Sequence, residues 1–385
     1  MTDTLVPLGS ERVTLANAAN RVLAEAVIAT KASPTRNLAA MDGYAIRNAP
    51  AGAGTISLRV VGQAAPACPY PGPIAAGDAV RIFTGAVVPE GADRVVPQEL
   101  ASCSGSHVAV PTRAGAARHV RERGSDFAAG TLLLPAGRLL DPRALLTAGA
   151  ADAATLCVRR KPRFFTLATG DEVRRAGSEA PSVHSIPDSV SPAVVALGEA
   201  WGAESVGSAI VPDRIESIEQ AACAAMRHAD VLILTGGASV GDRDFSKAAL
   251  ASLGLSLVFS KVAMKPGKPI WYGRVKGVHV LGLPGNPTAA LVTARLFLVP
   301  LLCGLLGRPA NAALPWRPLA LATPLAAGGD RETFLCGVAE GGTVRPIDRQ
   351  DASGQASIAM ANALIRGPAN GPPRAMGGLA MVVDF

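Results

Sequence analysis

The chain has 385 residues, of which 49% are hydrophobic and 17% charged, so it can fill several cores and is not disordered. The net charge of +7 suits anionic ligands, but only 4% of residues are aromatic, which argues against a nucleic-acid surface built on base stacking. The six cysteines include no closely spaced pair, which excludes a zinc framework and favours a reducing compartment. Met1–Arg12 lacks the basic start and apolar core of a signal peptide, so we expect a cytoplasmic protein.

The first 160 residues combine short strand-like runs with one helical pattern. Gly and Pro separate the runs, which is typical of a small β-rich domain, here over residues 32–128. A helical pattern covers Pro142–Ala153. We expect residues 1–31 and 129–160 to form a linking α+β domain. The strand-like runs are Ile56–Val61, Asp78–Phe83 and Arg94–Pro97.

Residues 161–310 alternate strand-like runs with amphipathic helical patterns. This alternation predicts a parallel sheet with helices on both faces, which binds ligands beyond the carboxyl ends of its strands. The predicted strands are Phe164–Ala168, Ser205–Val211, Val231–Leu234 and Val278–Leu283. The predicted helices lie near Ser191–Trp201, Arg214–Arg227 and Phe245–Leu253.

The last quarter of the chain begins with its most apolar segment. This segment, Ala289–Leu306, contains Arg295 and Pro300, and we expect a buried or interface helix rather than a membrane span. Short apolar runs and turns then predict a C-terminal β domain over residues 311–385. The whole pattern indicates a multidomain α/β plus β protein.

Two turn motifs in the β-rich part carry polar groups. The first, Met41-Asp42-Gly43-Tyr44-Ala45, is either a plain turn or a carboxylate presented to a metal ion or a ligand amine. In the second, the Thr84 hydroxyl is either a turn cap or a donor to an oxyanion. Asp126, in a later loop, carries only a weak local signal.

The four predicted strands of the central sheet end in polar or Gly- and Pro-rich turns. After the first strand, Asp171 and Glu172 suit a hard cation such as Mg²⁺, although an N-cap of a following helix explains them equally well. The third strand enters a glycine-rich loop, Thr235–Asp244, whose backbone N–H groups can surround a phosphate. The remaining ends are Pro212-Asp213 and Pro284-Gly285-Asn286-Pro287.

A basic loop, Met264-Lys265-Pro266-Gly267-Lys268-Pro269, completes the set of motifs. Lysine is a compact point charge, and two lysines on a proline-stiffened loop suit phosphate or a molybdate-like oxyanion. The alternative is an ordinary solvated surface.

Taken together and in this order, the motifs resemble the MoeA family, molybdopterin molybdenumtransferase, which also includes the gephyrin E-domain. The resemblance covers nearly the whole chain. It implies a central three-layer molybdopterin-binding α/β domain of MogA type, a β-rich domain, a linking α+β domain and a C-terminal β-barrel-like domain. It also implies a homodimer whose site lies between the α/β domain of one subunit and the β-rich domain of the other.

The activity implied by the resemblance is molybdenum cofactor biosynthesis. Molybdate is inserted into adenylylated molybdopterin, with Mg²⁺-dependent release of AMP. The adenylyltransferase of the pathway and recipient molybdoenzymes are the implied partners, and neither nucleic acid nor a membrane is expected. The implied residues are Asp42, Thr84, Asp126, Glu172 and Asp244 as catalytic; Asp171, Asp188, Ser189, Asp213, Gly236, Gly237, Ser239, Lys265, Lys268, Pro284, Gly285, Asn286 and Pro287 as substrate-binding; and Asp42 and Asp171 as Mg²⁺ ligands.

Two departures from the family pattern keep an alternative open. Val190 stands where the family usually has Asn, and Ser125 where it often has Glu. The alternative is a non-catalytic protein that binds or carries molybdopterin or its molybdenum cofactor. A variant that prefers tungstate is a further possibility, because tungstate and molybdate are tetrahedral dianions of similar size.

Overall fold

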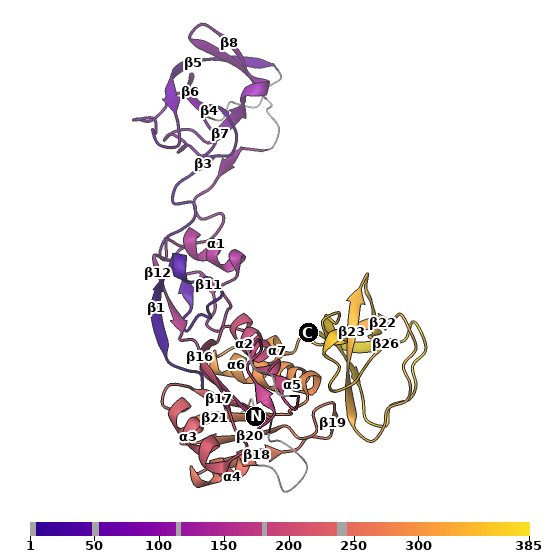
Figure 1. Cartoon of the computed structure of the whole chain (residues 1–385). Coiled ribbons are helices and arrows are strands. Elements are labelled where there is room, and N and C mark those ends of the chain that lie inside the picture. Colours follow the sequence, from indigo (N-terminus) through magenta and orange to yellow (C-terminus); the bar gives the residue numbers. More distant parts are fainter. Residues whose placement is uncertain (1–4, 48–53, 113–116, 179–182, 237–244) are drawn as a thin grey trace.

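The computed structural model describes residues 5–47, 54–112, 117–178, 183–236 and 245–385. The chain is elongated, with a β-rich domain at one end, a linking domain in the middle, and an α/β domain with a small barrel beside it at the other end (Figure 1). This arrangement confirms the multidomain α/β plus β fold.

The α/β domain is built on a six-stranded sheet in the order β16-β13-β17-β21-β20-β18. The four strands predicted from the sequence run parallel, but β20 pairs antiparallel with both β21 and β18, so the expectation of a purely parallel sheet was incomplete. Only Lys276 and Gly277, both with positive φ, connect β20 to β21, and a two-residue turn can join only antiparallel strands. The strands are β13 (Arg163–Thr169), β16 (Glu204–Val211), β17 (Val231–Thr235), β18 (Ser256–Ser260), β20 (Trp271–Val275) and β21 (Val278–Leu283).

Helices cover both faces of this sheet, which makes three layers. One face packs against α2 (Val190–Ala200) and a long helix made of α5 (Pro287–Thr293), η4 (Ala294–Leu298) and α6 (Val299–Leu305). The other face packs against α3 (Ile215–Ala225) and α4 (Phe245–Ser252). A short α7 (Ala310–Ala313) follows.

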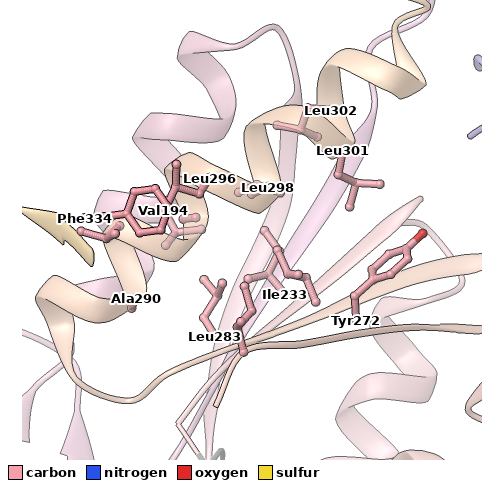
Figure 2. Close-up of a cluster of buried hydrophobic side chains, with 14 of the residues drawn as sticks. Val194, Ile233, Tyr272, Leu283, Ala290, Leu296, Leu298, Leu301, Leu302 and Phe334 are labelled. Carbon is pink, nitrogen blue, oxygen red and sulfur yellow. The ribbon is translucent and has the colours of Figure 1, made fainter. Parts of the chain in front are cut away.

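The C-terminal barrel is closed by five strands in the order β23-β24-β22-β26-β25, with β25 pairing back to β23. A short strand of the α/β domain, β19 (Met264–Lys265), adds to β23 in parallel. Figure 2 shows Phe334 of the barrel in one hydrophobic cluster with Ala290 and Leu296, so a shared core fixes the barrel against the α/β domain. The barrel elements are β22 (Arg317–Leu321), β23 (Glu332–Glu340), β24 (Thr343–Pro346), α8 (Gln355–Ile358), β25 (Ala363–Gly367) and β26 (Leu379–Asp384).

The linking domain packs two strand pairs and α1 (Pro142–Ala150) around a small core. The pairs are β1 (Ser10–Thr14) with β12 (Thr155–Arg159), and β2 (Val27–Ile28) with β11 (Leu132–Leu134). Arg160 makes two 2.7 Å hydrogen bonds to Asp230, which ties this domain to the α/β domain.

The β-rich domain contains a six-stranded sheet in the order β7-β4-β6-β5-β9-β8. Apolar clusters lie on both faces, so the sheet is buried on both sides. Its elements are β4 (Gly43–Ile46), β5 (Thr55–Ala64), β6 (Asp78–Ile82), β7 (Arg94–Pro97), η3 (Gln98–Leu100), β8 (Ser102–Ser104) and β9 (His107–Pro111). The short pair β3 (Leu38–Ala39) and β10 (Val120–Arg121) lies where the chain enters and leaves the domain.

The long apolar helix, Pro287–Leu305, belongs to the core. Within the described residues it is the one helix long and apolar enough to cross a membrane, and 83% of its apolar window is buried inside the protein. The helix continues through both Arg295 and Pro300. This burial agrees with the prediction of a buried or interface helix.

Arg295 is expected to be important for stability. Its side chain is 2% exposed, donates to the carbonyls of Asp384 and Ala313 at 2.8 Å each, and lies over the Trp201 ring. Substitution with Met removes the donor from both carbonyls and the buried guanidinium stack, so we expect Arg295→Met to lower the free energy of unfolding by about 2–4 kcal/mol. Urea denaturation measures the loss. Arg308→Met, which loses a stack on the same ring but neither of these carbonyl bonds, should cost far less.

His279 is expected to make the fold sensitive to acid. Burial, with a smaller contribution from Arg274, lowers the pKa of His279 to about 4 from 6.5, and the ring shares a 2.8 Å hydrogen bond with the Tyr272 hydroxyl. Since the folded pKa is depressed, the stabilisation is complete above pH 6.5 and is lost as the pH falls towards 4. The loss should reach about 2–3 kcal/mol. In His279→Gln, unfolding free energies measured across this window should fall less steeply; equal slopes would contradict the assignment.

Candidate active site

The polar turns of the central sheet meet at its carboxyl edge. Thr169 pairs with Val211, and Thr235 pairs with both Ala168 and Leu283, so three adjacent strand pairs end together. Parallel strands place their following turns at one edge, where doubly wound sheets bind ligands. A pocket of about 320 Å³ opens at this edge.

This strand-end pocket is lined by both the α/β domain and the barrel. Among the residues implied by the family resemblance, Asp188, Ser189, Gly236, Gly285, Asn286 and Pro287 line it. The barrel adds Ser353 and Gln355, which could not be predicted from the sequence because no local motif marks them. Thr288 N and Ala289 N both donate to the Ala352 carbonyl, so this barrel loop is held against the start of α5.

Gly236 is required by the backbone of the pocket. It has a φ of +87°, and a Cβ atom there would lie 2.3 Å from the Thr169 carbonyl oxygen. The turn after the next strand lies in ordinary contact, because a Cβ on Gly285 would lie 3.5 Å from the Gly236 Cα. The expected residues Gly237, Ser239 and Asp244 lie outside the described residues.

The carboxylates at this edge have different environments. Asp171 and Glu172 are exposed, and Asp171 Oδ1 accepts a 3.3 Å hydrogen bond from Asp213 N, so both aspartates lie at the same end of the sheet. No helix follows directly: after a turn comes β14 (Val173–Arg174), paired with β15 (Ile186–Pro187). The interpretation of Asp171 and Glu172 as an N-cap was therefore wrong.

Asp188 combines a structural role with its place in the pocket. Its Oδ1 accepts hydrogen bonds from Val190 N at 3.1 Å and Ser191 N at 2.9 Å, at the start of α2. One carboxylate oxygen thus holds the helix N-terminus. The departure at Val190 leaves this backbone contact intact, and the valine side chain packs against the main core.

A second pocket, of about 350 Å³, adjoins the first and is basic. Lys265, Lys268, Pro284 and Asn286 line it, and Asn286 also lines the strand-end pocket. Arg331 of the barrel joins the two lysines here. Arg331 could not be predicted from the sequence, because it is an isolated arginine in a loop that only the pairing of β19 with β23 brings to the lysines.

The remaining predicted residues lie in the β-rich domain. Asp42 Oδ1 accepts hydrogen bonds from Thr84 N and Thr84 Oγ1, each 2.7 Å long. These two bonds, with a smaller effect of Arg81, lower the pKa of Asp42 below its ordinary value. Asp126 is exposed in the loop after β10, and its N–H donates to the Ser33 carbonyl.

The two groups of residues are far apart in a single chain. Asp42 and Thr84 flank β4 and β6 at one end of the molecule, whereas β17 and α5, whose ends line the strand-end pocket, lie at the other end (Figure 1). Among the described residues, no cluster of three or more His, Cys, Asp or Glu could hold a metal ion within one chain.

Family models match two parts of the chain. Residues 1–151 match the MoeA N-terminal region (domain I and II), and residues 165–303 match the probable molybdopterin binding domain.

Relatives and solved structures agree with these matches. The molybdopterin molybdenumtransferase of Haemophilus influenzae is 34% identical over 78% of this chain and 74% of its own length, and that of Nostoc sp. is 35% identical over 85% and 77%. A crystal structure of the molybdopterin biosynthesis MoeA protein of Pyrococcus horikoshii, 27% identical, covers 100% of this chain and 96% of that protein with a TM-score of 0.83. The Haemophilus and Nostoc relatives carry the name of a transferase, which favours the enzyme over the carrier hypothesis. The chain therefore belongs to the MoeA family of molybdopterin molybdenumtransferases, enzymes of molybdenum cofactor biosynthesis.

Proposed function

We propose that this protein inserts molybdate into adenylylated molybdopterin and releases AMP in a Mg²⁺-dependent step. The observation that carries the proposal is the pair of adjoining pockets, one at the strand ends and one basic, joined at Asn286. The pterin ring system, with its polar edge, suits the first pocket, whose volume of about 320 Å³ is typical of small-molecule sites. The second pocket suits a small oxyanion beside it.

The basic pocket supplies the charge that a tetrahedral dianion requires. Lys265 and Lys268 are exposed point charges, whereas Arg331 can donate two hydrogen bonds in a fixed geometry. Charge-assisted hydrogen bonds from three cations would hold molybdate next to the pterin and orient it. Tungstate would bind in the same way, so competition between the two oxyanions measures the preference.

Mg²⁺ fits the carboxylates at the edge of the sheet. Proteins hold Mg²⁺ through one or two carboxylates together with substrate phosphates, and Asp171 and Glu172 are adjacent and exposed. Asp171, with Asp42 of a second subunit, is the proposed ligand pair. When bound, Mg²⁺ would offset the negative charge that develops on the phosphoanhydride oxygens. Thr84 would hold the Asp42 carboxylate ionised and in a fixed orientation.

A homodimer is proposed because the two halves of the site lie at opposite ends of a single chain. The β-rich domain of one subunit would reach the pockets of its partner. An apolar surface is available for pairing on the linking domain, where the cross-strand partners Ile28 and Leu132 are 55% and 58% exposed. We further propose a cytoplasmic enzyme that receives its substrate from an adenylyltransferase and passes its product to molybdoenzymes.

The test measures AMP release and reconstitution of a molybdenum apoenzyme from purified protein, adenylylated molybdopterin, molybdate and Mg²⁺. Release of AMP with reconstitution is expected. Tight binding of the pterin without AMP release would instead support the carrier.

Mixed dimers test the shared site. Asp42→Asn impairs the β-rich half and Lys268→Met impairs the basic pocket, so at limiting molybdate each variant alone should release little AMP. A mixed dimer has one site with both halves intact, and random mixing should restore about a quarter of the wild-type rate. Differently tagged copies verify that mixed dimers form. No recovery in verified mixed dimers would place the site within one chain.

A further inference from the structure

Arg81 in the β-rich domain makes an unusual number of contacts around Asp42. It lies on β6 and its guanidinium carbon lies 5.2 Å from the centre of the Tyr44 ring and 5.0 Å from that of Phe83. Tyr44 follows the Asp42-Gly43 turn, and Phe83 precedes Thr84. The guanidinium therefore connects the two segments that carry the Asp42–Thr84 pair.

Hydrogen bonds from Arg81 also hold the backbone of the turn. One terminal nitrogen donates to the Gly43 carbonyl at 3.0 Å, and the other donates to Gln98 Oε1 at 2.6 Å. Gln98 N in turn donates to the Asp42 carbonyl at 3.0 Å. The two successive carbonyls of the turn are thus fixed by one arginine and by the glutamine it binds.

The turn cannot relax by moving towards the neighbouring strand. A Cβ on Gly43 would lie 1.9 Å from the Val96 carbonyl oxygen, so β4 and β7 are already in close contact there. Small movements of the turn would change the 2.7 Å bonds between Asp42 and Thr84 directly.

We propose that Arg81 is the positioning residue of the β-rich half of the active site, acting through Asp42 rather than on the substrate. The proposal rests on the proposed function of the Asp42 carboxylate. Only a planar guanidinium can stack on two rings and bind two acceptors at once, so lysine should replace it poorly. Misplacing a reacting or metal-binding group by about 1 Å can cost about 100-fold in rate.

A double-mutant cycle on the full-length enzyme tests the proposal. Arg81→Met keeps much of the side-chain volume and should lower kcat for AMP release by about 10- to 100-fold, with KM for the pterin changed less than about twofold. Arg81→Lys should recover only part of the loss. In an Asp42→Asn background, Arg81→Met should cause almost no further loss, because its effect passes through Asp42. If Asp42→Asn is below detection, Thr84→Val serves as the background; Asp42 is then already less well held, and Arg81→Met should cause a smaller further loss than in the wild type.

The matched control is Arg59→Met, which removes an exposed arginine paired with Asp78 at 3.1 Å in the same sheet. Its kcat should stay near that of the wild type. An equal loss from Arg81→Met in both backgrounds would overturn the proposal, since a direct substrate contact or a general loss of stability acts independently of Asp42. Wild-type kcat in Arg81→Met would overturn it as well.

A second measurement separates this proposal from the proposed function. If the wild type releases no AMP, the proposed function fails, but hydrogen exchange still tests the position of the turn. Exchange in residues 40–46 and 81–87 should be faster in Arg81→Met than in Arg59→Met, with the α/β domain unchanged. Equal exchange in the two variants would overturn the positioning role.

Discussion

Lys268→Met is expected to lower kcat/KM for molybdate by about 100-fold, the effect of losing about 2–3 kcal/mol of charge-assisted binding. Lys268 is exposed, so little fold stability should be lost, and it faces the basic pocket together with Lys265 and Arg331. Because methionine is only one atom shorter than lysine, the change removes charge and little volume. Initial rates of AMP release at increasing molybdate measure the effect.

Lys261→Met is the matched control for this charge. Lys261 is exposed on the same segment of the chain, yet it lines neither the strand-end pocket nor the basic pocket. Its removal should leave the molybdate dependence within about twofold of the wild type, as expected for a screened surface charge. Similar losses in both variants would mean that the basic loop attracts anions through its overall positive electrostatic potential and forms no specific binding site.

Gly236→Ala is expected to weaken pterin binding by at least about 100-fold while most of the molecule stays folded. The new Cβ would lie 2.3 Å from the Thr169 carbonyl oxygen, a distance that forces one strand end to move. Gly236 also lines the strand-end pocket, so the displacement changes the pocket itself. Calorimetric titration with molybdopterin measures the binding, and a thermal melt checks the fold.

Gly254→Ala is the control that distinguishes this steric clash from the strain of a positive φ alone. Gly254 has a φ of +89°, close to the +87° of Gly236, but a Cβ there would meet nothing within 4 Å. Both substitutions carry a similar conformational cost of about 1 kcal/mol. If both variants bound the pterin equally, the close approach of Gly236 to Thr169 would not be what shapes the pocket.

The sequence by itself determined the layered α/β domain and the edge of its sheet at which the candidate site lies. Alternation of apolar strands such as Val231–Thr235 with amphipathic helices such as Ile215–Ala225 is a local pattern, and it dictates which faces are buried. Because the carboxyl ends of parallel strands meet at one edge, the turns at Asp171, Asp213 and Gly236 could be grouped without coordinates. The ordered set of motifs was enough to indicate the family.

Only the tertiary structure decided what completes the site. Arg331, Ser353 and Gln355 come from the barrel, and the shared core around Phe334 brings them to the pockets. Arg81 reaches the Asp42 turn because β6 pairs with β4. Such contacts join residues that are far apart in the chain, and they depend on how the completed sheets pack. Local periodicity and motif spacing do not predict this packing. The distance between the β-rich domain, which carries Asp42, and the α/β domain likewise follows from the elongated arrangement of the domains (Figure 1). Because of this distance, the proposed reaction requires a second subunit.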